Sequence, residues 1–178
     1  MRVVAGKYRA KKLKEFDIGT TRPTLDRIKE AMFSSIQFDV NGAIVVDLFS
    51  GTGALGLEAI SRGASKVYFV DSNREAIKII KENLAGVQED YEICCSDYER
   101  FLTEHKNSKF DIFLLDPPFA SNYDEIAIDK IIKSDLMNEG GIIVYEKAKS
   151  KQVEFDYENI AVKSKIYGTV EVIFLRKM

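Results

Sequence analysis

Between residues 43 and 145, short apolar runs alternate with helical patterns, and this rhythm leaves few possible folds. The apolar runs cover residues 44–49, 66–70, 92–95, 110–115 and 142–145, and helical patterns cover residues 54–62, 74–84, 98–105 and 125–133. Continuous apolar runs without a polar face are typical of strands buried on both sides. The alternation therefore predicts an α/β fold, with a mostly parallel sheet covered by helices on both faces.

The two ends of the chain break this rhythm. Residues 160–166 and 170–175 flank the turn Tyr167-Gly168-Thr169, which predicts a C-terminal antiparallel hairpin and completes a seven-stranded sheet. Residues 1–20 are expected to form a short basic ribbon, and Thr24 to cap a helix reaching residue 36. We expect residues 1–40 to pack as ribbon and helix on a main domain of residues 41–178.

Composition narrows the class of protein. The 178 residues are 46% hydrophobic and 30% charged, which is ordinary for a soluble globular domain. Since no run approaches the ~18 apolar residues of a membrane span, we expect no membrane association and a cytoplasmic location. The only cysteines, Cys94 and Cys95, are neighbours, and His105 is the only histidine. Neither a disulfide nor a metal site is expected.

Positive charge is concentrated at the N-terminus. Residues 1–29 carry a net charge of +6, whereas the whole chain carries −2. A basic segment on an acidic domain indicates a polyanionic partner such as RNA or DNA, although a solvated surface segment is the alternative. The candidate nucleic-acid contacts are Arg2, Lys7, Arg9, Lys11, Lys12 and Arg22.

A glycine-rich loop follows the first apolar run. Gly51, Gly53 and Gly56 fit the nucleotide-binding pattern Gly-x-Gly-x-x-Gly, in the strand-loop-helix context that it requires. Asp71 ends the next strand, where a carboxylate accepts hydrogen bonds from ribose hydroxyl groups. Asp97, after the third strand, is in position to reach an adenine amino group.

Acidic residues at the strand ends help to distinguish between two candidate ligands, a dinucleotide and S-adenosylmethionine. Asp47, Asp71, Asp97 and Asp116 all follow predicted strands, whose carboxyl ends meet at one edge of a parallel sheet. A dinucleotide would place its pyrophosphate beside the Asp47 carboxylate. S-adenosylmethionine, which carries an ammonium and a sulfonium group, suits these acids better. The alternative for any single acid is a helix cap or a turn.

The sequence Asp116-Pro117-Pro118-Phe119 ends the fourth strand and holds two of the three prolines. Proline lacks an N–H group and has a fixed φ, so the pair ends the strand and stiffens the turn. The turn offers a carboxylate, free carbonyl groups and an aromatic face, which suit a flat base with an amino group. A tight turn with a buried Phe119 is the alternative.

These motifs resemble those of class I methyltransferases that act on exocyclic amino groups. Residues 2–9, 21–33 and 55–64 add a closer resemblance, to the RsmD family, which methylates the N2 amino group of a guanine in bacterial small-subunit ribosomal RNA. The resemblance covers nearly the whole chain and implies a Rossmann-like fold with S-adenosylmethionine as cofactor. It also implies a ribosomal RNA substrate, either as free RNA or within an assembling small subunit; we expect a monomer.

The resemblance implies roles for individual residues. Asp47, Gly51 and Gly53 would contact the methionine part of the cofactor, Asp71 the ribose, and Asp97 with Tyr98 the adenine, while Asp116, Pro117, Pro118 and Phe119 would hold the base. The full cofactor set is Arg22, Thr24, Asp47, Phe49, Gly51, Gly53, Asp71, Ser72, Asp97 and Tyr98. Three rivals stay open: an adenine or cytosine amino methyltransferase, an NAD-dependent oxidoreductase, and a non-catalytic RNA-binding module.

Overall fold

The computed structural model describes residues 1–16, 23–118 and 121–178. The predicted site residues Arg22 and Phe119 lie outside the described residues, as does the side chain of Thr24.

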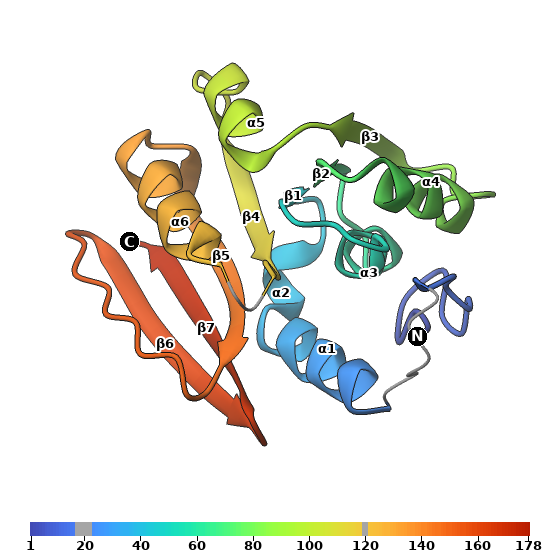
Figure 1. Cartoon of the computed structure of the whole chain (residues 1–178), viewed down its shortest axis with the longest axis horizontal. Coiled ribbons are helices and arrows are strands. Elements are labelled where there is room, and N and C mark those ends of the chain that lie inside the picture. Colours follow the sequence, from blue (N-terminus) through green and yellow to red (C-terminus); the bar gives the residue numbers. More distant parts are fainter. Residues whose placement is uncertain (17–22, 119–120) are drawn as a thin grey trace.

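The described residues form one seven-stranded sheet in the order β3-β2-β1-β4-β5-β7-β6 (Figure 1). Strands β1 to β5 pair in parallel, β7 pairs antiparallel with β5, and β6 pairs antiparallel with β7. The strands are β1 (Ile44–Asp47), β2 (Lys66–Asp71), β3 (Asp90–Cys95), β4 (Phe110–Leu115), β5 (Met137–Ala148), β6 (Ile160–Tyr167) and β7 (Val170–Lys177). The predicted α/β class and the C-terminal hairpin are confirmed.

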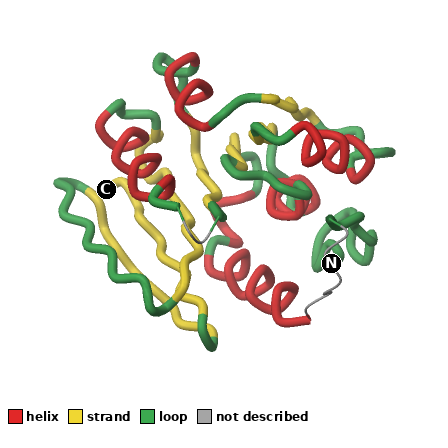
Figure 2. Tube along the Cα trace, in the orientation of Figure 1, coloured by secondary structure: helices red, strands yellow, loops and turns green. Residues whose placement is uncertain are grey.

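Helices cover both faces of the sheet, as Figure 2 shows. One core includes Phe33, Leu57 and Ile80 from helices on the first face, and the other includes Phe101 and Ile128 from helices on the second. On the first face lie α1 (Pro23–Ser35), α2 (Gln37–Val40), α3 (Ala54–Ser61) and α4 (Arg74–Asn83), and on the second α5 (Tyr98–Glu104) and α6 (Tyr123–Lys133). Burial on both faces explains why the central strands are continuous apolar runs.

Two elements differ from the sequence prediction. Strand β5 begins at Met137 rather than 142 and includes Gly140 and Gly141. Its pairing with β4 is irregular, because Phe110 pairs with Met137 whereas Ile112 pairs with Ile142. Extra residues of this kind form a bulge. From the sequence pattern alone, a bulge with two glycines is interpreted as the turn before the strand. The short helix α2 was not predicted, since four residues give no helical period.

The N-terminal ribbon is bound to α3 by specific hydrogen bonds. The backbone N–H groups of Val4 and Ala5 donate to the buried carboxylate of Glu58, at 2.8 and 3.1 Å. Gly6 has a φ of +83°, and a Cβ atom there would lie 1.8 Å from the carbonyl oxygen of Ser61. Val3 is fully buried in the core of this face. The ribbon therefore packs as an integral part of the fold.

No described helix is long and apolar enough to cross a membrane. Cys94 and Cys95 are both free thiols. No group of three or more candidate metal ligands comes together among the residues that the structure describes.

Candidate active site

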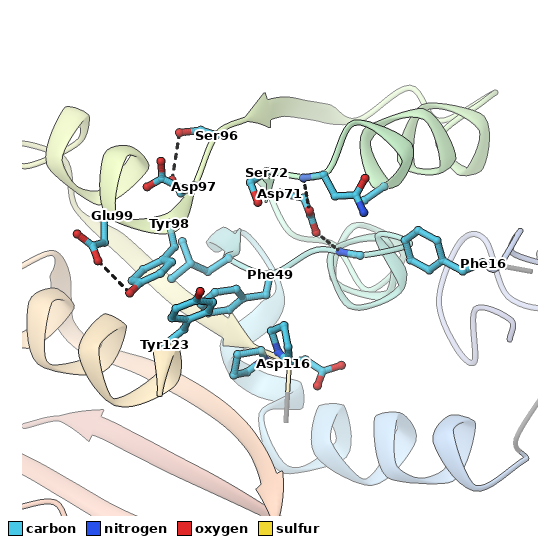
Figure 3. Close-up of a pocket in the computed structure, with 16 residues that line it drawn as sticks. Phe16, Phe49, Asp71, Ser72, Ser96, Asp97, Tyr98, Glu99, Asp116 and Tyr123 are labelled. Carbon is cyan, nitrogen blue, oxygen red and sulfur yellow. Dashed lines mark hydrogen bonds between the residues drawn. The ribbon is translucent and has the colours of Figure 1, made fainter. Parts of the chain in front are cut away.

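A cavity of about 1010 Å³ opens at the carboxyl edge of the parallel strands (Figure 3). The loops after β1, β2, β3 and β4 form its walls, joined by Phe16 from the ribbon and Tyr123 from α6. Ligands of doubly wound folds bind at this edge. The volume lies at the upper end of small-molecule sites and is sufficient for more than one bound group.

Hydrogen bonds beneath the cavity fix the glycine loop. The N–H group of Gly56 donates to Asp47 Oδ2 at 2.9 Å, while Asp47 Oδ1 is buried without a hydrogen-bond partner. The Asp47 side chain is only 1% exposed, and desolvation raises its pKa to about 7. Ser50 Oγ donates to the Asp47 carbonyl oxygen and accepts from the Val70 N–H group. Asp47 thus supports the loop from below and does not line the cavity.

Asp71 is held at the cavity wall by two backbone groups. The N–H of Gly51 donates to its Oδ2, and the N–H of Asn73 donates to its Oδ1, both at 2.8 Å. Gly51 has a φ of +54°, a left-handed conformation that favours glycine. Both carboxylate oxygens are therefore fixed in direction, with lone pairs left for hydroxyl donors of a ligand.

Aromatic rings line the wall on the β3 and β4 side. The Phe49 and Tyr98 ring centroids lie 5.3 Å apart, and those of Tyr98 and Tyr123 lie 5.5 Å apart (Figure 3). Desolvation and a hydrogen bond to Glu99 raise the pKa of Tyr98 to about 12. Asp97 caps α5 by accepting from the Arg100 N–H group at 2.8 Å. This wall suits the face of a flat ring system.

Asp116 follows the last residue of β4, and its side chain is open to the cavity. Desolvation by the surrounding protein raises the pKa of the carboxyl group to about 6. The Pro118 carbonyl oxygen accepts from the Ser121 N–H at 3.0 Å and from Ser121 Oγ at 2.8 Å. The fixed φ angles of Pro117 and Pro118 restrict the backbone that follows Asp116.

The charge of the cavity is negative. Among the described residues that line it, the charged ones are Asp71, Asp97, Glu99 and Asp116, and none is lysine or arginine. Within the described lining, a pyrophosphate group would meet these carboxylates without a compensating cation. A cationic nucleoside is the better match.

Most of the predicted site residues line the cavity, together with other residues that were not predicted. Predicted residues that line it are Phe49, Gly51, Asp71, Ser72, Asp97, Tyr98, Asp116, Pro117 and Pro118. Asp47 does not line it, and neither does Gly53, which packs against Ile80 and Phe69 at the start of α3. Lining residues that sequence reasoning missed are Phe16, Leu48, Asn73, Ala76, Ser96, Glu99 and Tyr123. Several are neighbours of predicted residues, but Phe16 and Tyr123 come from other segments.

The basic residues of the ribbon differ in whether they already have a partner within the protein. Lys7 forms an ion pair with Glu89 at 2.5 Å, and the Lys11 ammonium donates to the Ala85 carbonyl oxygen at 2.8 Å. Arg2 lies 3.9 Å from Asp26, whereas Arg9 and Lys12 are simply exposed. Arg9 and Lys12 are therefore the clearest surface cations of this segment.

Sequence comparison identifies the family. The family model "Conserved hypothetical protein 95" matches residues 1–176. Ribosomal RNA small subunit methyltransferase D of Haemophilus influenzae is 32% identical over 96% of this chain and 90% of its own length. The chain belongs to the RsmD family. The RsmD protein of Escherichia coli K12 is 30% identical over 82% of this chain and 74% of its own length.

Solved structures agree with this membership of the RsmD family. The Escherichia coli protein yhhF has a TM-score of 0.88 and 25% identity, and the match covers 99% of this chain and 97% of that protein. A more distant match is the 16S rRNA N2 methyltransferase RsmC of Thermus thermophilus, in complex with AdoMet and guanosine. It has a TM-score of 0.69 at 22% identity, covering 92% of this chain and 45% of RsmC, and shows a shared fold.

Proposed function

We propose that this RsmD-family protein transfers a methyl group from S-adenosylmethionine to the N2 amino group of a guanine in small-subunit ribosomal RNA. The observation that carries the proposal is the rigid Asp116-Pro117-Pro118 turn in the wall of an acidic, nucleoside-sized cavity. The names of the Haemophilus influenzae and Escherichia coli relatives support a ribosomal RNA substrate. RsmC, with the same fold, carries AdoMet and guanosine.

The cavity fits S-adenosylmethionine by its chemistry. Asp71 would accept the ribose hydroxyl groups, since both its oxygens are fixed in direction. Tyr98 and Phe49 would pack on the adenine, and the open backbone of Gly51 would face the methionine part. When bound, the cofactor supplies an electrophilic methyl group on a positively charged sulfur. The acidic lining would favour that charge.

Asp116 and the neighbouring proline carbonyl group would hold the target amino group. The N2 lone pair of guanine is delocalised into the ring, so the free amino group is a poor nucleophile. Hydrogen bonds from its two N–H groups to Asp116 and the Pro117 carbonyl oxygen would direct the lone pair toward the methyl group. Asp116, with its raised pKa, is a suitable acceptor for the proton that N2 releases. Phe119 would stack on the base at about 1–3 kcal/mol.

The rest of the chain would hold the RNA. Residues 1–40 form the ribbon and helix that we propose as the RNA-contacting part of the fold, with residues 41–178 as the methyltransferase domain. Arg9 and Lys12 would contact phosphate groups around an unpaired or flipped-out base. We further propose that the protein acts as a monomer in the cytoplasm, on RNA within an assembling small subunit.

The test is transfer of labelled methyl groups to ribosomal RNA from a strain that lacks the enzyme. Digestion to nucleosides should yield labelled N2-methylguanosine. Asp116→Ala should lower transfer at least a hundredfold, while cofactor affinity, measured by calorimetry, changes less than about threefold. Labelled methyladenosine or methylcytidine would support the rival amino methyltransferases. Retained turnover in Asp116→Ala would contradict the proposed site.

A further inference from the structure

A second carboxyl group stands beside Asp116 on the neighbouring strand. Leu115, the last residue of β4, pairs with Tyr145 of β5 in parallel register. The next residue along each strand is acidic, namely Asp116 and Glu146. Neighbouring strands lie about 4.8 Å apart, so the register places the two residues side by side.

The two side chains also project from the same face of the sheet. Leu114 of β4 and Val144 of β5 belong to the core beneath α1 and α3, whereas Leu115 and Tyr145 belong to the opposite core. Because side chains alternate along a strand, the residues that follow Leu115 and Tyr145 return to the first face. The Glu146 side chain is half-buried.

The position of Glu146 is on the side away from the cofactor. Asp71, Phe49 and Gly51, the proposed cofactor contacts, lie over β1 and β2. Glu146 does not line the main cavity but a small one of about 20 Å³, which shares Pro117 and Pro118 with it. Lys147 and Lys151 also line the small cavity, and their ammonium groups pair with Glu171 and Asp124. A base held at Asp116 and approached by the methyl group from the β1 side would have Glu146 on its other side.

The proposed function requires a base with a particular edge. Guanine presents the N1–H donor next to its N2 amino group. Adenine has the N1 acceptor beside its amino group, and cytosine has the N3 acceptor there. Two adjacent carboxyl groups match a row of donors and repel a ring nitrogen lone pair.

We propose that Glu146 accepts a hydrogen bond from N1–H of the target guanine while Asp116 holds its N2 amino group, so that Glu146 is the residue that selects guanine. This inference rests on the proposed guanine methylation and adds the origin of its base specificity. Burial and the nearby Asp116 charge raise the pKa of Glu146 to about 7. Donors from guanine and a cationic cofactor beside the pair would both favour its ionised form.

The test compares two bases that share the N2 amino group. A synthetic fragment of small-subunit ribosomal RNA carries either the mapped target guanine or 2-aminopurine, which has an acceptor at N1. The kcat/KM of the wild-type protein should be at least about tenfold higher for guanine than for 2-aminopurine. A hydrogen bond to a charged group contributes enough free energy for a factor of this size. Glu146→Gln should reduce that ratio at least about tenfold, because the glutamine amide can donate to N1 of 2-aminopurine.

Matched variants separate specificity from folding. Glu139→Gln makes the same change at the amino-terminal end of β5, where Glu139 pairs with Lys177 on the surface, and should leave the ratio unchanged. Glu146→Asp keeps the charge and should lower the rate while retaining the preference for guanine, which keeps the test valid if Glu146→Gln folds poorly. An unchanged ratio in Glu146→Gln, or lost preference in Glu146→Asp, would overturn the inference. If wild-type protein methylates neither fragment nor whole ribosomal RNA, the proposed function itself fails.

Discussion

At the scale of single residues, the same side chain serves different purposes according to its surroundings. Asp47 and Asp116 both end parallel strands, and desolvation raises the pKa of both. Asp47 is sealed below the glycine loop and bonded to Gly56, whereas Asp116 opens into the cavity. Asp47 therefore fixes the glycine loop, whereas Asp116 is placed to contact a substrate.

The pH dependence of methyl transfer should report Asp116. The carboxylate is the form that accepts N–H groups, and the pKa is about 6, so the rate should fall as the pH drops below about 6. Asp47 from β1 and Glu146 from β5 are the acidic groups that interact with it. Glu146, with a pKa of about 7, is mostly uncharged at the pH where Asp116 titrates, so Glu146→Gln should leave the acidic limb near pH 6. Single-turnover rates from pH 5 to 8 measure this.

The control for this profile is again Glu139→Gln, whose acidic limb should match that of the wild-type protein. An acidic limb that moves down by a full pH unit in Glu146→Gln would show instead that the charge of Glu146 controls the pKa of Asp116.

At the scale of elements, one buried carboxylate joins the ribbon, α1 and α3. Glu58 is 0% exposed and accepts from the N–H groups of Val4 and Ala5. Its Oε2 lies 3.5 Å from the Lys29 ammonium on α1, and its Oε1 accepts from Arg62 at 2.8 Å. Such a group fixes the geometry of the ribbon more than it adds net stability.

Glu58→Ala should lower the free energy of unfolding by about 3–5 kcal/mol, because it leaves two backbone donors without an acceptor and removes the carboxylate beside buried Lys29. Urea denaturation measures the loss, and amide exchange at Val4 and Ala5 should become faster. Glu104→Ala removes a carboxylate from an exposed pair with Arg100 and should change stability by less than about 0.5 kcal/mol. A loss in Glu58→Ala no greater than in this control would contradict the linking role.

The elements show how far sequence reasoning reaches. Apolar periodicity predicted the parallel strands and the hairpin, because burial on each face imposes a direct pattern. It failed at the start of β5, where pairing with β4 continues past Gly140 despite a bulge. The burial of Asp47 beneath the glycine loop could not be predicted, since a motif fixes position along the chain but not the direction of a side chain. Phe16 and Tyr123 required the fold itself, as distant segments bring them to the cavity.

At the scale of the whole molecule, charge is divided between the cavity and the ribbon. The cavity lining is acidic, while residues 1–29 carry +6 on a chain of net charge −2. The described part of the ribbon reaches the cavity, because Phe16 forms part of the cavity wall. A polyanion bound along the ribbon would thus be led to the site, while the acidic cavity accepts the cationic cofactor and a neutral base.

RNA affinity should therefore depend on salt through the ribbon. Arg9 and Lys12 are exposed, so the double variant Arg9→Ala/Lys12→Ala should reduce the slope of log K against log salt concentration by roughly 1.4–1.8, about 0.7–0.9 for each lost phosphate contact. Fluorescence anisotropy with an RNA fragment measures the slope, and cofactor affinity should not change. The double variant Lys106→Ala/Lys133→Ala removes the same charge near the amino edge of the sheet and should leave the slope within about 0.3. Equal slopes for the two double variants would mean that RNA is held by net charge alone and not by the ribbon.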